Sequence, residues 1–410
     1  MTPLRILAVA VLIIAVLALW MPLTSEILCL IFRRKAGKAV DGLPETPRLL
    51  FLVPAHDEEL LIADCVRSLM QLDYPVTHRR VLVIADNCTD ATAALARESG
   101  ADVLERVDAQ RPGKPRALAW ALDQVKLSEW DACIVVDADS IVAPQFAAGV
   151  AKLAPLNDIV FQPNNLVQNE FDNWLTRLGG LLGRSRFYVT YPLKQSAALN
   201  CPISNGMGFG TNLLIRDGWQ SFSITEDTEL YAVYTEAGVS IRHAAGADLF
   251  SQEARSLPQG AIQRRRWIAG RFEIARNWIP RLLRSPRVSW RQKLDAIVEL
   301  ILPAPVLHLL VTVSIGALAL LVVGGRAGRW IAIAGAASLL GIVVTTLTAI
   351  ALHPQPWKTV ASFLMLPMYA VWRIVVLVRT VATVGDRSWR RTARVNPSVG
   401  GAMPVAGPRA

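Results

Sequence analysis

Residues 132–140, ACIVVDADS, form an apolar run that ends abruptly in two carboxylates, Asp137 and Asp139. A short run of this kind, bounded by polar residues, is typical of a buried strand in a parallel sheet. The aspartates then follow the carboxyl end of the strand, where open α/β sheets bind their ligands. Side chains two positions apart in an extended segment point the same way, so this pair can converge on one cation. The alternative is that the pair only caps a turn.

Apolar runs of strand length alternate with helical patterns on both sides of this stretch. Strands are predicted at residues 49–53, 81–85, 102–104, 132–137, 158–162, 212–216, 239–242 and 247–250. Helices are predicted up to residue 72, after 90, at 114–126, at 171–199, from about 225 and after 258. Such alternation favours an α/β fold with a mostly parallel sheet, right-handed crossovers and helices on both faces. The polar residues that follow the strands should then line one edge of the sheet.

The composition indicates segments inside a membrane. Hydrophobic residues make up 52% of the 410 residues, which is high for a purely soluble protein. The formal net charge is +10, and residues 255–293 hold eleven basic residues against one acidic residue. Because long apolar runs follow this basic stretch, anionic lipid headgroups and phosphorylated substrates fit it better than a specific nucleic acid. The five cysteines show no metal-ligand spacing, which predicts free thiols in a reducing compartment.

The amino-terminal apolar segment predicts a retained membrane anchor. Residues 4–23 are almost unbroken in their apolar character and long enough to cross a hydrocarbon core. Arg33, Arg34 and Lys35 follow, and by the positive-inside rule they place the downstream chain in the cytoplasm. The predicted segments are a transmembrane anchor at 1–36, a linker at 37–47 and a cytoplasmic catalytic domain at 48–255.

The carboxyl-terminal part is predicted to hold further membrane-associated segments. The helix after Pro258 spaces apolar side chains along one side and arginines along the other, so it should lie in the membrane interface, with a kink at Pro280. Arg373 and Arg379 would be costly inside a bilayer, which argues against a last crossing. The predicted segments are interface helices at 256–295, a transmembrane hairpin at 296–353, an interfacial or re-entrant segment at 354–386, and a basic, then disordered tail at 387–410.

Polar residues with possible roles in catalysis or binding follow the first predicted strands. Pro54, His56 and Glu58 come after the first strand, although acidic residues there also suit the first turn of a helix. Asp86 ends the second strand, where a carboxylate suits an exposed nucleobase N–H, or else simply forms a turn. Lys114 opens a helix and would neutralise a diphosphate, or else it is a solvated lysine. Its surroundings do not match a P-loop.

Two later motifs complete the set of candidate residues. Glu226 and Asp227 open a helix, and Asp227 can act as a general base toward an acceptor hydroxyl. The alternative is a capping box formed by Ser223 and Glu226. The motif Gln263-x-x-Arg266-Trp267 offers a platform for a sugar ring and a phosphate partner, or else it is only the first turn of the interface helix.

In their order along residues 48–290, these motifs resemble those of the membrane-integrated family 2 glycosyltransferases. This family includes cellulose, hyaluronan and poly-N-acetylglucosamine synthases and many bacterial exopolysaccharide glycosyltransferases. The resemblance implies a GT-A fold, an inverting transfer from a nucleotide sugar, and Mg²⁺ or Mn²⁺ on the diphosphate. His56 stands where the family more often has asparagine.

The resemblance also implies a role for each motif. Pro54, His56, Glu58, Asp86, Lys114, Asp137 and Asp139 would bind the nucleotide sugar, with Asp86 on uracil and Asp137 and Asp139 on the metal. Asp227, with Glu226 beside it, would be catalytic, and Gln263, Arg266 and Trp267 would contact the acceptor and the diphosphate.

We therefore expect a membrane-bound glycosyltransferase that moves a sugar, UDP-linked, to a growing exopolysaccharide or a lipid-linked acceptor. The alternatives are transfer of a single sugar to polyprenyl phosphate or a glycolipid, and an inactive membrane scaffold. The expected location is the plasma membrane of a bacterium, with several crossings, a cytoplasmic catalytic domain, and export or polymerisation subunits as possible partners.

Overall fold

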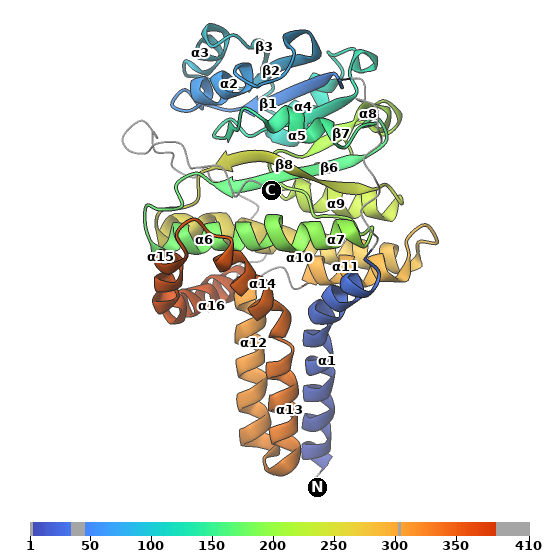
Figure 1. Ribbon diagram of the computed structural model, residues 1–410, viewed down its shortest axis with the longest axis vertical. Helices are drawn as coiled ribbons and strands as arrows, with labels where there is room; N and C mark the ends of the chain where they lie inside the picture. Colours follow the sequence, from blue (N-terminus) through green and yellow to red (C-terminus); the bar gives the residue numbers. More distant parts are fainter. Residues whose placement is uncertain (1–2, 34–45, 302–304, 383–410) are drawn as a thin grey trace.

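The structure, a computed structural model, describes residues 3–33, 46–301 and 305–382. Figure 1 shows a globular α/β part and a bundle of long helices that projects from it. The predicted linker lies largely outside the described residues, and the predicted tail at 387–410 lies wholly outside them. The described strands all fall between residues 49 and 251, inside the predicted catalytic domain.

The globular part is built on one mixed sheet. Its strands are β1 (Leu49–Ala55), β2 (Arg79–Asp86), β3 (Asp102–Arg106), β4 (Ala132–Val135), β5 (Ile141–Val142), β6 (Val160–Val167), β7 (Gly208–Gly210) and β8 (Ile241–Ser251). Within the described residues their order is β3-β2-β1-β4-β7-β6-β8-β5. Strands β3, β2, β1 and β4 are parallel, β6 and β8 are parallel, and β7 and β5 run antiparallel to their neighbours. The predicted α/β fold class with a mostly parallel sheet is confirmed.

Strand β1 lies at the centre because both of its faces are apolar. Leu49, Phe51 and Val53 point into one hydrophobic core, whereas Leu50 and Leu52 point into the other. The first core is covered by α2 (Ile62–Met70), α3 (Thr92–Glu98) and α5 (Phe146–Ala151), and the second by α4 (Lys114–Leu122), α8 (Thr211–Asp217) and α9 (Glu226–Glu236). Burial on both faces is what a continuous apolar run such as LLFLV predicts.

The predicted strand at 212–216 is wrong, because these residues belong to helix α8. A five-residue apolar run cannot by itself distinguish a strand from a buried helical turn. The strand is instead β7, in the preceding glycine-rich stretch. A Cβ on Gly208 would lie 2.0 Å from the ring of Phe161, so glycine at this position lets β6 and β7 approach each other.

The two short strands predicted at 239–242 and 247–250 form one strand, β8. Its register with β6 shifts after Pro163, so that three residues of β8 bulge out of the ladder. Gly246 lies in this bulge with φ +82°, a conformation that glycine adopts without strain. The bulge hides the continuity of the strand in the sequence pattern.

A layer of helices lies between the sheet and the projecting bundle (Figure 1). It contains α6 (Trp174–Arg184), the π-helical turn η3 (Ser185–Thr190), α7 (Tyr191–Ser196), α10 (Leu257–Arg284) and α11 (Trp290–Ile301). Part of the apolar side of α10, predicted to lie in the membrane interface, packs on the globular part instead. Ile274 and Leu282 are buried in the second core, whereas Phe272 and Leu283 are more than half exposed. Contact of α10 with a membrane stays a prediction.

Four helical segments among the described residues are long and apolar enough to cross a membrane. Three of them form the bundle: α1 (Pro3–Ile31), α12 (Pro305–Leu318) with η4 (Ala319–Val323), and α13 (Gly325–Ala337) with α14 (Leu340–Ala351). The fourth contains α15 (Pro356–Ala361), η5 (Ser362–Met365) and α16 (Leu366–Ala382). In Figure 1, α16 lies across the axis of the bundle. The interfacial or re-entrant placement of this segment stays a prediction. Two short turns, η1 (Val76–His78) and η2 (Leu127–Glu129), complete the helical elements of the described residues.

A buried ionic cluster joins the bundle to the globular part. Lys194 of α7 donates to Asp295 of α11 at 2.7 Å and to Glu299 of α11 at 2.8 Å. Ser25 of α1 donates to the same Asp295 at 2.8 Å. Because a buried charge without its partner is costly, this cluster fixes where α1 meets the helical layer.

The close packing at Gly208 generates a stability prediction. Gly208→Ala places a methyl group inside the Phe161 ring, and such overpacking should lower the free energy of unfolding by about 2 kcal/mol. The matched control is Gly183→Ala, where the new methyl would meet its nearest neighbour at 3.7 Å. Thermal unfolding in detergent measures both variants, and equal midpoints for the two would contradict the packing argument.

Candidate active site

The buried ion pair of Asp86 and Arg106 forms one end of the site. Asp86 ends β2 and Arg106 ends β3, and the two residues are directly opposite in the parallel register. Arg106 donates to Asp86 Oδ1 at 2.5 Å, and the Gly113 backbone N–H donates to Oδ2 at 3.1 Å. Asp86 is only 4% exposed, so it needs this cation. The sequence analysis missed Arg106. The signal that could have found it is a positively charged residue just after the strand that follows Asp86 in the sequence.

The turn after β1 lies against the end of β2. Pro54 is opposite Ile84 in the register of β1 and β2. His56 Nδ1 lies 2.7 Å from the backbone oxygen of Asp86 and donates to it. Glu58 is buried, and its backbone N–H donates to Thr92 Oγ1 at 2.7 Å. Of the three residues predicted from the first motif, His56 therefore directly contacts Asp86.

Lys114 connects three elements that are distant in the sequence. It is the first residue of α4, and its Nζ lies 2.7 Å from Asp137 Oδ1, just after β4. The same Nζ lies 3.0 Å from Oε1 of Glu226, the first residue of α9. These two ion pairs, called the Lys114 bridge below, join the start of α4, the end of β4 and the start of α9. The sequence analysis did not pair Lys114 with Glu226.

Burial and charge act against each other in this bridge. Burial opposes the charge on Lys114, but Asp137 and Glu226 outweigh it and raise the lysine pKa. Burial raises the pKa of Glu226, and Asp227 adds to the effect, whereas Lys114 lowers it. Lys114 is therefore a permanent cation that keeps two crowded carboxylates together.

Asn205 positions the turn that carries Asp137 and Asp139. The Asp137 backbone N–H donates to Asn205 Oδ1 at 2.9 Å, and Asn205 Nδ2 donates to Ser140 Oγ at 2.7 Å. Ser140 Oγ in turn lies 3.3 Å from Asp139 Oδ1. Asn205, in the glycine-rich stretch, is a positioning residue that the sequence analysis missed.

Asp137 and Asp139 fit a divalent cation shared with a substrate. Both side chains are half-buried at the edge of the sheet and offer carboxylate oxygens, the ligands that Mg²⁺ and Mn²⁺ prefer. Mg²⁺ sites at phosphate substrates often use only one or two carboxylates, with phosphate oxygens and water completing the coordination. Two aspartates, with Asp137 also paired to Lys114, match that pattern.

A second group of side chains could by its chemistry hold a metal ion. It consists of Asp57, Cys88 and Asp90, which each offer one possible ligand atom, and these atoms fall within 4.8 Å of one another. The backbone N–H of Thr89 donates to Asp57 at 2.7 Å, and that of Glu59 donates to Asp90 at 3.1 Å. These contacts give the carboxylates a structural role in joining the turns after β1 and β2.

Helix α10 approaches the start of α9 closely. A Cβ on Gly270 would lie 2.4 Å from Thr225 Oγ1, and Thr225 directly precedes Glu226 and Asp227. The capping box of Ser223 and Glu226 does not form: Thr225 is the N-cap residue, and the Glu226 side chain contacts Lys114. Asp227 instead accepts a hydrogen bond from the Thr228 backbone N–H at 2.6 Å.

The motif residues of α10 lie one to two turns before Gly270. Gln263 Oε1 and Arg266 Nε are buried, and neither has a hydrogen-bond partner in the described part of the chain. Buried polar atoms usually have partners, so these two are available to a ligand. Trp267 is 41% exposed. Within the described ranges, no hydrogen bond joins Gln263 or Arg266 to the carboxylates around Lys114.

Two further arginines surround Asp227 with positive charge. Arg186 of η3 and Arg271 of α10 both interact electrostatically with Asp227. Arg271 Nη1 also donates to the backbone oxygen of Glu299 at 2.6 Å. The sequence analysis missed both residues, because only the fold brings η3 and α10 together.

Comparison with known proteins gives the class of this protein. The profile described as "Glycosyltransferase like family 2" matches residues 47–270, more than half of the chain. The chain therefore belongs to the family 2 glycosyltransferases.

Individual relatives are distant. The probable glycosyltransferase YdaM of Bacillus subtilis is 23% identical over 281 residues, covering 62% of this chain and 63% of YdaM. A beta-monoglucosyldiacylglycerol synthase of Nostoc is 28% identical over 206 residues, covering 48% of this chain and 42% of that protein. The chain thus spans less than two thirds of the length of these relatives.

The fold also has a solved counterpart. A mannosyltransferase from Pyrobaculum calidifontis, in complex with GDP-Man and Mn²⁺, superimposes with a TM-score of 0.57 at 17% identity, over 93% of this chain and 100% of that one. The predicted GT-A fold is confirmed.

The buried pair at Asp86 predicts a large loss of stability. Arg106→Gln leaves the Asp86 carboxylate buried without its cation, which should lower the free energy of unfolding by about 3 kcal/mol. The control Arg97→Gln removes a surface ion pair with Glu105 and should cost less than about 1 kcal/mol. Thermal unfolding distinguishes the two, and Asp86→Asn added to Arg106→Gln should recover part of the loss.

The Lys114 bridge predicts a change in pH dependence. Because Lys114 lowers the pKa of Glu226, Lys114→Met should raise that pKa and keep Glu226 protonated to higher pH. The acidic limb of the turnover profile should then move to higher pH, with lower maximal turnover. Lys126→Met, which removes only a surface pair with Glu129, should leave the limb in place. An unmoved limb in Lys114→Met would contradict the coupling.

Proposed function

We propose that this chain catalyses a metal-dependent, inverting transfer of a sugar from a nucleotide sugar to a lipid-linked acceptor at a membrane. The observation that carries the proposal is the Lys114 bridge between Asp137 and Glu226. It gathers a cation, the candidate metal carboxylates and the start of α9, where Asp227 lies, at one edge of the sheet. A nucleoside diphosphate leaving group needs this combination of charges.

The donor nucleotide would lie along the edge from Asp86 to Asp139. Asp86, held in place by Arg106 and Gly113, would accept from the imide N–H of uracil. Asp137 and Asp139 would hold Mg²⁺ or Mn²⁺, which would neutralise the diphosphate as its bond to the sugar breaks. The mannosyltransferase with the similar fold was solved with GDP-Man and Mn²⁺, which supports a metal and keeps a GDP-sugar in the donor panel.

Asp227 would take the proton of the acceptor hydroxyl. Asp227 lies in the first turn of α9, and Thr225 at that helix start packs on Gly270, on the side of α10 that carries Gln263 and Trp267. The hydroxyl would attack the anomeric carbon from the side opposite the diphosphate, so the configuration inverts. Arg266 and the half-exposed Trp267 would orient the acceptor and the sugar.

The bundle favours a lipid-linked acceptor over a polymer exported through this chain. Side chains from α1, α12, η4 and α13 fill the centre of the bundle, among them Leu12, Val16, Ile315 and Ile331. The described helices therefore enclose packed side chains at this place. The Nostoc relative is named as a glycolipid synthase, which agrees with a lipid acceptor. The location proposed is a cellular membrane, crossed by α1, α12–η4 and α13–α14, with the sheet on the cytoplasmic side.

The base assignment is tested by Asp227→Asn. Turnover of the nucleotide sugar by protein in nanodiscs, with acceptor lipids supplied, should fall at least about 10²-fold because the proton acceptor is lost. Binding of the nucleotide, measured by calorimetry, should persist. Asp123→Asn, at an exposed position after α4, is the control. Undiminished turnover in Asp227→Asn would reject this role.

The metal assignment is tested on a panel of UDP- and GDP-sugars. Chelation with EDTA should stop turnover, and Mn²⁺ or Mg²⁺ should restore it. Asp139→Asn should require more metal for half-maximal turnover because one ligand oxygen loses its charge. Turnover that survives chelation would contradict metal dependence, and silence across the whole panel would favour the scaffold alternative.

A further inference from the structure

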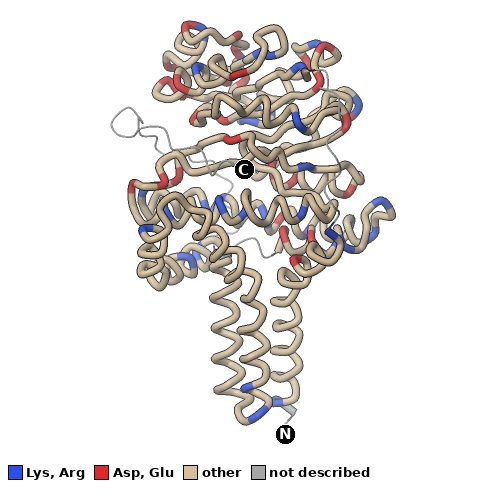
Figure 2. The backbone as a smooth tube through the Cα atoms, viewed as in Figure 1, with Lys and Arg blue, Asp and Glu red and all other residues tan. Residues whose placement is uncertain are grey.

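Among the described residues, the free end of the bundle carries three arginines and no acidic residue. The amino end of α1 and the turn between η4 and α13 lie together at this end (Figure 1). Arg5, Arg326 and Arg329 are the only Lys, Arg, Asp or Glu residues in 3–25 and 305–351. Figure 2 shows the same excess of positive charge where the described helices end, far from the globular part.

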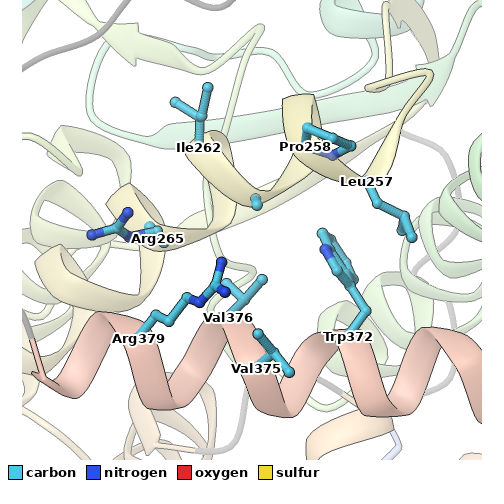
Figure 3. A pocket seen from close by; sticks show the side chains of 9 residues that line it. Leu257, Pro258, Ile262, Arg265, Trp372, Val375, Val376 and Arg379 are labelled. Atoms are coloured by element: carbon cyan, nitrogen blue, oxygen red, sulfur yellow. The ribbon is translucent and has the colours of Figure 1, made fainter.

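These three arginines lack a counter-charge within the described chain. All three are exposed, and none of their guanidinium groups makes an ion pair or a hydrogen bond with another described residue. Arg265 and Arg379, which line a cavity of about 310 Å³ between α10 and α16 (Figure 3), differ because both already interact with other residues. The arginines at the free end are therefore available to an external anion.

The first turns of α13 present two of the arginines on one face of the helix. Arg326 and Arg329 are three residues apart, and Trp330 and Ile333 continue this face toward the middle of the bundle. Trp330 is 64% exposed and Ile333 is 55% exposed. Ile331, by contrast, belongs to the core that fills the bundle. The outer face of α13 thus combines two cations, an indole ring and then an apolar side chain.

Close packing sets the rotation of this helix. A Cβ on Gly328 would lie 2.4 Å from the backbone oxygen of Ala319, so α13 and η4 pack with their backbones in contact. At 3.6 residues per turn, Arg326 lies on the side of α13 opposite Gly328. The contact with η4 therefore holds Arg326 away from the centre of the bundle.

We infer that the free end of the bundle binds the phosphate groups of anionic phospholipids, in the membrane leaflet farther from the globular part. Arg326 and Arg329 would hold a headgroup, and Arg5 of α1 would add a third positive charge. Trp330 would lie at the membrane interface, where indole rings concentrate. Leu321 of η4, which is 83% exposed, would face the acyl chains. The inference rests on the membrane crossing in the proposed function and not on the transfer reaction.

The position of the arginines favours a lipid as the occupant. Under the positive-inside rule, short loops on the far side of a membrane are poor in Lys and Arg, so topology alone does not account for Arg326 and Arg329 beside this turn. An acidic protein would also match their charge. The arginines are, however, continuous with the exposed apolar surface at Trp330 and Ile333, which acyl chains cover and an acidic protein surface does not.

The test uses the full chain in nanodiscs that contain photoreactive phosphatidylglycerol or, in a matched sample, photoreactive phosphatidylcholine. Mass spectrometry of the peptides counts the lipid crosslinks on residues 326–333. The wild-type chain should give at least about fivefold more crosslinks with phosphatidylglycerol, the factor that one arginine near an anionic lipid surface contributes. The double variant Arg326→Gln/Arg329→Gln should give equal numbers with the two lipids.

Two controls separate charge from structure. The double variant Arg326→Lys/Arg329→Lys keeps both charges and should keep the preference for phosphatidylglycerol. Crosslinks on α10 in the same samples should not change in either double variant, because α10 lies at the other end of the bundle (Figure 1).

Equal crosslinking of the two lipids to residues 326–333 of the wild-type chain would overturn the inference and leave an acidic partner protein as the occupant. A preference that persists in the glutamine variant would overturn it as well. A chain that does not enter nanodiscs would contradict the membrane crossing itself. Because turnover is not measured, a failed transferase assay leaves this result unaffected.

Discussion

The ion pairs of Lys114 hold the candidate active site together. Asp137 and Glu226 come from a strand end and a helix start almost 90 residues apart, and both carboxylates would repel each other without the lysine between them. Lys114 also directly follows Gly113, whose backbone N–H donates to Asp86. One lysine thereby ties the part of the site around Asp86 to Asp137 and to the start of α9.

Helix α10 packs on different partners with its two sides. Gly270 lets one side approach Thr225 at the start of α9, while Arg265 and Ile262 on the other side line a cavity between α10 and α16. The buried cluster of Lys194, Asp295 and Ser25 makes a second connection, between the helical layer and α1. Such buried charges specify one arrangement of the layer, because any other would leave a charge unpaired.

The sequence pattern predicted the parallel core of the sheet because strands such as LLFLV and ACIVV are apolar on both faces. The pattern wrongly predicted a strand at 212–216, and it predicted two separate strands where the structure has the single strand β8. In the first case a short apolar run was compatible with either a strand or a helical turn, and the strand β7 depends on glycines that carry no apolar signal. In the second case a bulge at Gly246 interrupted the pattern of a single strand.

The sequence by itself determined the order of the motifs, the family and the apolar segments, because these depend on local spacing and composition. Only the tertiary structure decided that Arg106 neutralises Asp86, and that the Glu226 side chain contacts Lys114 instead of forming a capping box. It also decided that part of the apolar side of α10 packs in the second hydrophobic core. Each of these contacts joins residues that are far apart in the chain. Their partners are set by strand register and helix packing, which local sequence does not encode.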